Sequence, residues 1–578
     1  MFKRQIEGDL KKVVEDLGYE SPDLVLSIPK NLGFGDYTSN IALQLANQKS
    51  DKGQQSPKKI ANKIVARIKN LESSKDYLEK VEIAGPGFIN FFLKDETLLL
   101  NIPKVCNYSA FVNPEVELDL QKRKVFMEYA QPNSHKLFHI GHTRNISLGE
   151  SISRLLESQG NEVYRSTYGS DIGLPVAKAI WGIQSLEEEY KKVKKSSLDE
   201  KVSFLGKAYA KGAKAYGEDE ESKKIIDELN IEIYKRDKKI MPIWEETKQW
   251  SAEYLEGMFQ KLGTKFDRAF WESEVEGLGS EIVRNNIGKI FEKDQGAVIF
   301  PGEKYGLHNR VFLTAAGNPT YEAKDLRLAQ FKQEIWPFDL GLILSGSEQA
   351  EYFKVMFKAL EMIDDSFAGK MMNFSFGMVN LPSGKMSSRT GEVVTFDWLY
   401  EQVRDRVGKI MKDHSKLKGD EKDSVIDTVS IGAIKFSMLK YSPQTDITFD
   451  IEKSVSLDGD SGPYLQYTYA RAKSVLRTAS YNYAPGAEAK DLETEERTLL
   501  QKIEHFEVVL EESAKNYSPN TLAEYLLDFA RSFNLFYQKH QIIKAEEKME
   551  LRLALTCATA VVLKQGLYLL GIEAPERM

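Results

Sequence analysis

The chain has 578 residues, of which 42% are hydrophobic, 11% aromatic and 29% charged. These proportions are typical of a soluble globular protein with several cores, and they exclude collagen-like, low-complexity and small disulfide-rich proteins. The formal net charge of −7 excludes a bulk polycation for nucleic acid, although a local basic face stays possible. The apolar stretch 553–563 is too short to cross a membrane, the N-terminus lacks the apolar core of a signal peptide, and only Cys106 and Cys557 are cysteines. We therefore expect a cytoplasmic protein without a Cys-rich metal site or a membrane partner.

The first 115 residues are predicted to form a small α/β domain. Apolar residues recur at helical spacing over residues 59–71. Residues 81–93 alternate and then run apolar around a Gly-Pro-Gly break, which predicts two strands and a turn. Residues 101–123 are predicted to connect this domain to the next one.

Residues 116–455 are predicted to form a catalytic domain with a Rossmann-type parallel sheet. Residues 124–129 form an apolar run, residues 141–158 have helical periodicity before the stop signal Gly160, and residues 161–168 predict the next strand. Strand, helix and strand in this short span are typical of a βαβ unit, and hence of a doubly wound α/β fold.

The remaining segments are predicted mainly as helices. Residues 185–265 are rich in Glu and Lys with helical periodicity, which favours helical insertions with a solvated surface and no chemistry of their own. Residues 456–578 are predicted to form an all-α bundle, including an amphipathic helix over 550–570. Further strands are expected at 297–300, 311–314 and 340–344.

Three of the seven histidines, His135, His139 and His142, lie where the first predicted strand turns into its helix. Ligands bind at such carboxyl ends of strands, and the free N–H groups of a helix start attract phosphate. Two imidazoles three residues apart can donate hydrogen bonds to phosphate oxygens, and Gly141 lets a ligand approach the backbone. A zinc site is disfavoured because the nearby sequence lacks the further ligands that would complete it. Histidines that only pack against the helix or cap it remain an alternative.

A second motif, Gly384-Lys-Met-Ser-Ser-Arg-Thr-Gly391, follows about 240 residues later. Its glycines, serines and Lys385 suit a mobile segment that grips phosphate. Neither a Walker loop nor a Gly-x-Gly-x-x-Gly fingerprint occurs in the sequence, so P-loop ATPases and dinucleotide oxidoreductases lose support.

Together, His139-Ile-Gly-His142 and Lys385-Met-Ser-Ser-Arg389 resemble the HIGH and KMSKS motifs of class I aminoacyl-tRNA synthetases. Further residues make the chain similar to arginyl-tRNA synthetases over nearly its whole length. They are Glu128, Pro132-Asn133, Lys136, the Tyr321-x-x-x-Asp325 pair, Gly462-Pro-Tyr-Leu-Gln-Tyr467, Ala574-Pro-Glu-Arg-Met578, Gly33-Phe-Gly-Asp36 and Gly85-Pro-Gly-Phe-Ile-Asn90.

The resemblance implies an arginine–tRNA ligase. Such an enzyme uses ATP with Mg²⁺ to convert L-arginine into arginyl-adenylate, and then transfers the arginine to the 2′-hydroxyl of the terminal adenosine of tRNA(Arg). It further implies that tRNA is needed for activation, with residues 1–115 as a tRNA-binding domain and residues 456–578 as an anticodon-binding domain. We expect a monomer with no tightly bound metal and no DNA partner.

The resemblance also assigns roles to residues of the catalytic domain. Catalysis would depend on His139, His142, Lys136 and Lys385. ATP would contact His139, Gly141, His142, Lys385, Met386, Ser387, Ser388 and Arg389, and arginine would contact Glu128, Asn133, Tyr321, Asp325 and Gln349. This chain has Ser388 where KMSKS has its second lysine, and Lys136 stands where many arginyl enzymes carry the substitute. Ala130-Gln131 replaces a serine pair that is frequent in the family.

Residues for tRNA are expected mainly in the C-terminal helices. Tyr464, Tyr467 and Arg471 share one helical face in a stretch without acidic residues, and aromatics with arginine suit unpaired bases; a Tyr-rich packing face is the alternative. Tyr537, Met578, Phe88 and Asn90 are further candidates by resemblance. The competing functions are another class I synthetase of glutamyl, cysteinyl or lysyl type, a catalytically inactive tRNA-binding paralogue, and a plain nucleotidyltransferase.

Overall fold

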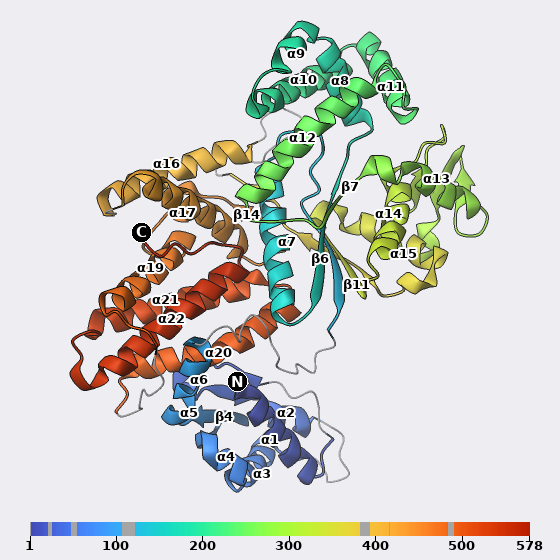
Figure 1. Ribbon diagram of the computed structural model, residues 1–578. Helices are drawn as coiled ribbons and strands as arrows, with labels where there is room; N and C mark the ends of the chain where they lie inside the picture. The colour runs from blue at the N-terminus through green and yellow to red at the C-terminus, as the bar shows by residue number, and fades with distance from the viewer. Residues whose placement is uncertain are drawn as a thin grey trace.

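The computed structural model describes residues 2–20, 26–47, 55–106, 122–381, 394–414, 417–483 and 491–578, with side chains up to residue 412 in the fifth range. Its centre is a five-stranded parallel sheet in the order β12-β11-β5-β6-β7 (Figure 1). The strands are β5 (Lys124–Glu128), β6 (Glu162–Gly169), β7 (Arg268–Trp271), β11 (Leu340–Gly346) and β12 (Met371–Phe376). The predicted parallel core is confirmed. The strand order reverses between β5 and β11, and such a reversal marks the ligand crevice of α/β sheets.

Alternate residues of β5 face opposite layers of helices. Val125 and Met127 pack in the cluster that contains the buried side of α7, whereas Phe126 packs in the cluster on the other face of the sheet. The helices concerned are α7 (Ile140–Ser158), α14 (Tyr321–Ile335) and α15 (Ala350–Ile363). Helix α7 follows the prediction and stops before Gly160, which has a φ of +82°.

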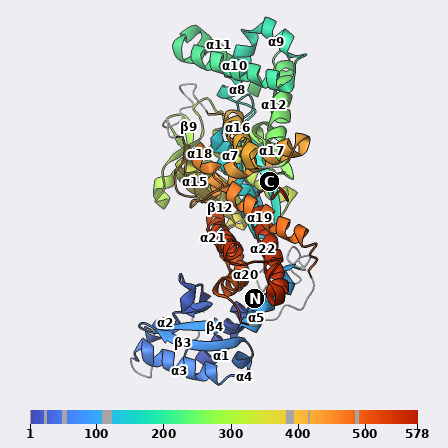
Figure 2. The same ribbon diagram turned by 90° about the vertical axis from the view of Figure 1, so that its left-hand side faces the viewer.

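Helical insertions project from one end of this core, at the opposite end of the molecule from the N-terminal domain (Figures 1 and 2). They are α8 (Leu174–Gln184), α9 (Glu187–Val193), α10 (Leu198–Glu218), α11 (Glu220–Tyr234) and α12 (Met241–Lys261). Of the three later strand predictions, only 340–344 joins the parallel sheet. The other two form a separate antiparallel sheet in the order β10-β9-β8, beside α13 (Glu276–Asn285). Its strands are β8 (Glu292–Asp294), β9 (Ala297–Phe300) and β10 (Arg310–Leu313).

The N-terminal domain is α/β, as predicted. It consists of the antiparallel sheet β1-β2-β4-β3 covered by short helices. The elements are α1 (Lys3–Asp16), β1 (Leu26–Ser27), β2 (Tyr37–Ser39), α2 (Ile41–Ala46), α3 (Pro57–Lys69), α4 (Glu72–Tyr77), β3 (Leu78–Ala84), β4 (Phe88–Leu93), α5 (Asp95–Leu99) and α6 (Asn101–Cys106).

The C-terminal part is helical, as predicted, but helices already dominate from Phe396. A two-stranded ladder of β13 and β14 ties the start of this part to the segment after β12. The elements are β13 (Val379–Asn380), α16 (Phe396–His414), α17 (Gly419–Leu439), β14 (Ile447–Thr448), α18 (Ile451–Ser454), α19 (Gly462–Thr478), α20 (Thr494–Lys515), α21 (Pro519–Lys539) and α22 (Met549–Leu569). None of the helices in the described parts of the chain is long and apolar enough to cross a membrane.

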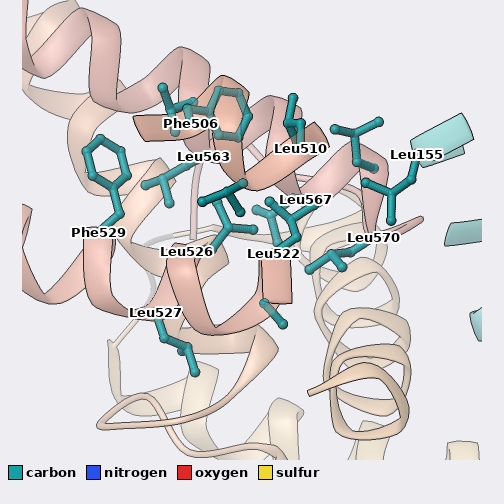
Figure 3. Close-up of a cluster of buried hydrophobic side chains, with 14 of the residues drawn as sticks. Leu155, Phe506, Leu510, Leu522, Leu526, Leu527, Phe529, Leu563, Leu567 and Leu570 are labelled. Atoms are coloured by element: carbon teal, nitrogen blue, oxygen red, sulfur yellow. The ribbon is translucent and has the colours of Figure 1, made fainter. Parts of the chain in front are cut away.

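Helix α22 corrects one prediction. It spans the predicted residues, but it is buried on nearly every side rather than amphipathic, because neighbouring helices surround it. Figure 3 shows Leu563 and Leu567 of α22 among side chains of α20 and α21, such as Phe506 and Leu526, with Leu155 of α7 at the edge. The core of the bundle therefore continues onto the catalytic domain.

The N-terminal domain is attached to α20 through buried polar groups. Glu504 is fully buried and accepts hydrogen bonds from the hydroxyl of Tyr37 (2.8 Å) and the amide nitrogen of Asn101 (2.6 Å). Asp36, also fully buried, accepts one from Nε2 of Gln501 (2.8 Å). Hydrogen bonds are directional, so these contacts set the orientation of the domain as well as its attachment.

Candidate active site at the ends of β5 and β11

The loop that leaves β5 is held in an unusual backbone conformation. Ala130, Gln131 and His135 have φ values of 77°, 49° and 60°, in the left-handed region that non-glycine residues rarely adopt. Each costs on the order of 1–3 kcal/mol, and such strain clusters at functional sites. The backbone N–H of His135 donates to Oγ of Ser251 (3.0 Å), and its ring nitrogens contact the hydroxyls of Ser134 and Thr247. His135 therefore anchors the loop to α12, away from the other two histidines.

His139 and His142 form a stacked pair at the start of α7. Their ring centroids are 3.7 Å apart. Nδ1 of His139 accepts a hydrogen bond from the backbone N–H of Gly141 (3.1 Å), and Nδ1 of His142 accepts one from the backbone N–H of His139 (3.2 Å). A neutral imidazole that accepts at Nδ1 carries its proton on Nε2. Both rings are thereby set as Nε2–H donors.

The charge state of the pair agrees with this tautomer. Burial, aided by the Lys136 ammonium, lowers the pKa of His139 to about 4. Burial, the neighbouring His139 and Lys136 also lower the pKa of His142 well below its ordinary value. Both imidazoles are therefore neutral at pH 7, and Lys136 supplies the positive charge beside them. Burial lowers the pKa of Lys136 itself, and its ammonium lies 5.1 Å from the Tyr209 ring centre.

One expectation about this helix start is wrong. The first N–H groups of α7 are not free for phosphate, since Ile140 donates to the carbonyl of Val394 (3.3 Å), Gly141 donates to His139, and His142 donates to the carbonyl of His139 (2.9 Å). A Cβ at Gly141 would lie 3.0 Å from the His139 ring, so the glycine lets this ring close over the helix start; contact of Gly141 with ATP stays a prediction. The donors offered here are the imidazoles.

The second motif, with Lys385, Met386, Ser387, Ser388 and Arg389, lies outside the described residues. The first residues described after it contact the histidine motif. Val394 accepts the hydrogen bond from Ile140, and the N–H of Phe396 donates to the carbonyl of Phe138 (3.0 Å). The residues from Val394 onward therefore lie beside the first motif.

Glu128 ends β5 and is nearly fully buried, but protein groups already contact both of its oxygens. Oε2 pairs with the ammonium of Lys332, and Oε1 accepts a hydrogen bond from Nε2 of Gln131 (2.8 Å). Asn133 is half-buried in the same loop. Gln349 is exposed and lies just beyond β11, so it borders the same crevice from the other strand.

Asp325, on α14, has only one of its two carboxylate oxygens hydrogen-bonded among the described residues. Its Oδ2 accepts a hydrogen bond from the hydroxyl of Tyr352 (2.5 Å), while its buried Oδ1 has no hydrogen-bond partner among the described residues. Burial, reinforced by the Glu128 carboxylate, raises the pKa of Asp325 to about 7 although the Tyr352 hydrogen bond opposes the shift. Tyr321 lies one turn earlier on α14, and its side chain is 55% exposed at the mouth.

Tyr168, on β6, lies near Asp325 and was missed by sequence reasoning. Its hydroxyl is buried without a hydrogen-bond partner among the described residues. Burial and nearby carboxylates, Asp325 foremost, raise its pKa well above the ordinary value. A buried carboxylate oxygen and a buried phenol that both lack partners suit a planar cation with several N–H donors. Among the described residues, no three His, Cys, Asp or Glu side chains are grouped to hold a metal ion.

The predicted tRNA residues of the helical part lie together. The guanidinium of Arg471 lies 4.8 Å from the ring centre of Tyr467 and 5.1 Å from that of Tyr537. Arg471 also donates to Oδ1 of Asn534, whose amide nitrogen donates to the hydroxyl of Tyr464 (2.9 Å). Asn534 thus positions this cluster, and sequence reasoning missed it. Met578 lines a small apolar cavity with Tyr467 and other residues.

The two N-terminal candidates differ in accessibility. Phe88 is 40% exposed, whereas Asn90 is 5% exposed and accepts a hydrogen bond from the hydroxyl of Thr38 (2.7 Å). Phe88 is therefore the better placed of the two for contact with a large ligand.

Comparisons with known proteins cover the whole chain. Residues 1–93 match the family described as the arginyl tRNA synthetase N terminal domain, residues 111–451 that of the class I (R) tRNA synthetase catalytic domain, and residues 465–578 that of the DALR anticodon binding domain. The arginine–tRNA ligase of Flavobacterium psychrophilum is 31% identical over 547 residues, which cover 90% of this chain and 88% of that protein. The arginine–tRNA ligase of Bdellovibrio bacteriovorus is 32% identical over 539 residues, or 90% and 89% of the two chains. The solved structure of the Thermus thermophilus arginyl-tRNA synthetase shares the fold over both whole chains, with a TM-score of 0.82 at 24% identity.

Proposed function

Because the chain belongs to the arginyl-tRNA synthetase family, we propose that it acts as an arginine–tRNA ligase through the crevice between β5 and β11. It activates arginine with ATP and transfers the arginine to tRNA. Two observations carry this assignment to particular residues. Two neutral Nε2–H donors lie at the start of α7, which follows β5, and Asp325, whose buried Oδ1 is unbonded, lies close enough to Glu128 at the end of β5 to feel its charge.

The first step joins arginine to AMP. The carboxylate of arginine attacks the α-phosphate of ATP, an oxygen–phosphorus bond forms, and pyrophosphate leaves. His139 and His142 donate hydrogen bonds from Nε2 to the phosphate oxygens as their charge grows, while Lys136 and Lys385 neutralise the triphosphate. Mg²⁺ enters with the ATP as part of the substrate. Positioning and charge neutralisation account for most of the acceleration.

The arginine side chain would lie across the crevice with its guanidinium against Asp325. Oδ1 of Asp325 accepts an N–H of the guanidinium, and the ring of Tyr321 covers its plane. Glu128, Asn133 and Gln349 would hold the amino and carboxylate groups of arginine. In the second step a ribose hydroxyl of the terminal adenosine, the 2′-hydroxyl by class, takes the arginyl group and AMP leaves.

The tRNA would contact both ends of the molecule. Tyr464, Tyr467, Arg471 and Tyr537 would bind bases of the anticodon loop near Met578, and Phe88 with Asn90 would approach the tRNA elbow. We expect domain boundaries near residues 115 and 455. Strand β14 (447–448) pairs with β13, which directly follows the parallel sheet, and this pairing supports a second boundary after residue 448. We further expect activation to need bound tRNA, and a cytoplasmic monomer without a DNA or membrane partner.

The test is a charging assay with tRNA(Arg) and radiolabelled arginine, lysine or citrulline. Citrulline has the shape of arginine without its charge, so it cannot pair with Asp325. A site built to bind the charged guanidinium rejects an analogue that lacks the charge by roughly 10⁴-fold or more. Comparable charging of citrulline would remove the pocket assignment. Tight tRNA binding without adenylate formation would instead identify an inactive paralogue.

A further inference from the structure

The only two cysteines of the 578-residue chain meet at the junction of two domains. Cys106 ends α6 of the N-terminal domain, and Cys557 lies in α22 of the helical bundle. The two helices pack against one another. Sγ of Cys106 lies 4.0 Å from the carbonyl oxygen of Ala554, which is one turn before Cys557 on the same helix. The two thiols are close enough that each shifts the pKa of the other.

The surroundings of the pair give the two thiols different reactivity. The neighbouring Cys106 thiol, aided by the Lys473 ammonium, lowers the pKa of Cys557. The neighbouring Cys557 sulfur and burial raise the pKa of Cys106. Thiolates are the reactive form of cysteine, so Cys557 is the nucleophile of the pair. Both side chains are half-buried, which leaves them within reach of a small oxidant.

We propose that Cys106 and Cys557 are a reversible disulfide site that fastens the N-terminal domain to the last helix of the chain. The oxidant is a peroxide. The Cys557 thiolate attacks one peroxide oxygen, the S–O bond forms as the O–O bond breaks, and the released hydroxide takes a proton to become water. The sulfur of Cys106, as it gives up its proton, attacks the sulfenic sulfur; the S–S bond forms and a second water leaves. A dithiol reductant reverses the reaction.

The position of this bond determines its effect. It would lie beside the polar interface between the N-terminal domain and α20, and would join residues about 450 positions apart. A link across so long a loop stabilises the protein mainly by restricting the unfolded chain. Oxidation should therefore raise the melting temperature and leave the crevice between β5 and β11 unchanged.

The experiment treats the full-length protein with hydrogen peroxide under native conditions. We expect the free-thiol count to fall from two to zero, and non-reducing peptide mapping by mass spectrometry to recover one linked pair containing Cys106 and Cys557. Dithiothreitol should restore both thiols and the original melting temperature. Recovery of both free thiols after oxidation, or of separately oxidised cysteines without a linked peptide, would overturn the proposal.

Three variants distinguish the roles within the pair. Cys106→Ser should stop at a sulfenic acid on Cys557 that dimedone traps, whereas Cys557→Ser should react with peroxide much more slowly. Neither variant should show the rise in melting temperature. Lys473→Met keeps both thiols and should slow oxidation at neutral pH but not at a pH where Cys557 is fully ionised. Equal oxidation rates for the two single-cysteine variants would contradict the assigned order of attack.

Discussion

Arginine binding should depend on pH through Asp325. Its carboxyl has a pKa of about 7 in the unliganded protein, because it is buried near Glu128 with one oxygen unbonded. Only the ionised form can pair with a guanidinium. The ionised fraction is about one tenth at pH 6 and about nine tenths at pH 8, so the apparent Kd for arginine should rise about tenfold between pH 8 and pH 6. Bound arginine should lower this pKa again and release a proton near pH 7.

Direct binding measures this pH dependence better than turnover does, since phosphate groups also titrate at about pH 6. Isothermal titration calorimetry of arginine, with tRNA present, at pH 6, 7 and 8 in buffers of different ionisation enthalpy gives both affinity and proton release. The histidine pair stays neutral over this range and adds nothing to the slope. Equal wild-type affinity at pH 6 and pH 8, with no proton released, would refute the reasoning.

Two variants control for other titrating groups. Asp325→Asn should bind arginine weakly and without pH dependence. Tyr352→Phe removes the hydrogen bond that lowers the pKa of Asp325, so the midpoint of the binding curve should move to higher pH. The free energy of unfolding should change with pH in the opposite direction to the affinity for arginine. The folded pKa lies above the unfolded value, so Asp325 lowers the free energy of unfolding as pH rises between the two, and Asp325→Asn should remove that loss.

Three further predictions concern ATP and tRNA. His142→Ala should lower single-turnover adenylation by about 10²-fold or more with tRNA binding unchanged, because it removes a positioned donor; near-normal turnover would contradict the role. Lys136→Ala should lower the adenylation rate strongly, and Arg389→Ala should lower it less. Ser388→Lys should restore part of the rate lost in Lys136→Ala. A normal adenylation rate in Lys136→Ala would show that this lysine is an ordinary loop residue. Arg471→Ala should weaken tRNA binding by about tenfold in a filter-binding assay, since one stacking partner is worth roughly 1–3 kcal/mol, while arginine binding stays constant.

Local patterns predicted the architecture around the crevice well. The apolar run before the histidine motif, the helical period after it and Gly160 reproduced β5, α7 and its end, because each depends on neighbours within a few residues. The resemblance singled out Tyr321 and Asp325 as a pair four residues apart, and the structure has both on α14, which begins at Tyr321.

Features that depend on distant parts of the chain could not be read in this way. The hydrogen bond of Tyr352 to Asp325 joins two helices, and the unbonded Oδ1 exists only because of their packing. Ala130 and Gln131 have left-handed backbone conformations, but neither is a glycine or an asparagine, the residue types from which such a conformation could be predicted. The hydrogen bond of the Ile140 N–H at the start of α7 depends on Val394, which lies more than 250 residues later in the chain.

The polar interface between the N-terminal domain and α20 fixes the separation between the two proposed RNA contact points. Glu504 and Gln501 of α20 hold the N-terminal domain in one orientation, and α20 also packs in the bundle that carries Arg471. With the proposed roles of Phe88 and Arg471, the two contact points for RNA are therefore a fixed distance apart. An RNA with the right anticodon but a lengthened or bent arm would reach only one of them at a time, and would lose the gain in effective concentration that two simultaneous contacts provide.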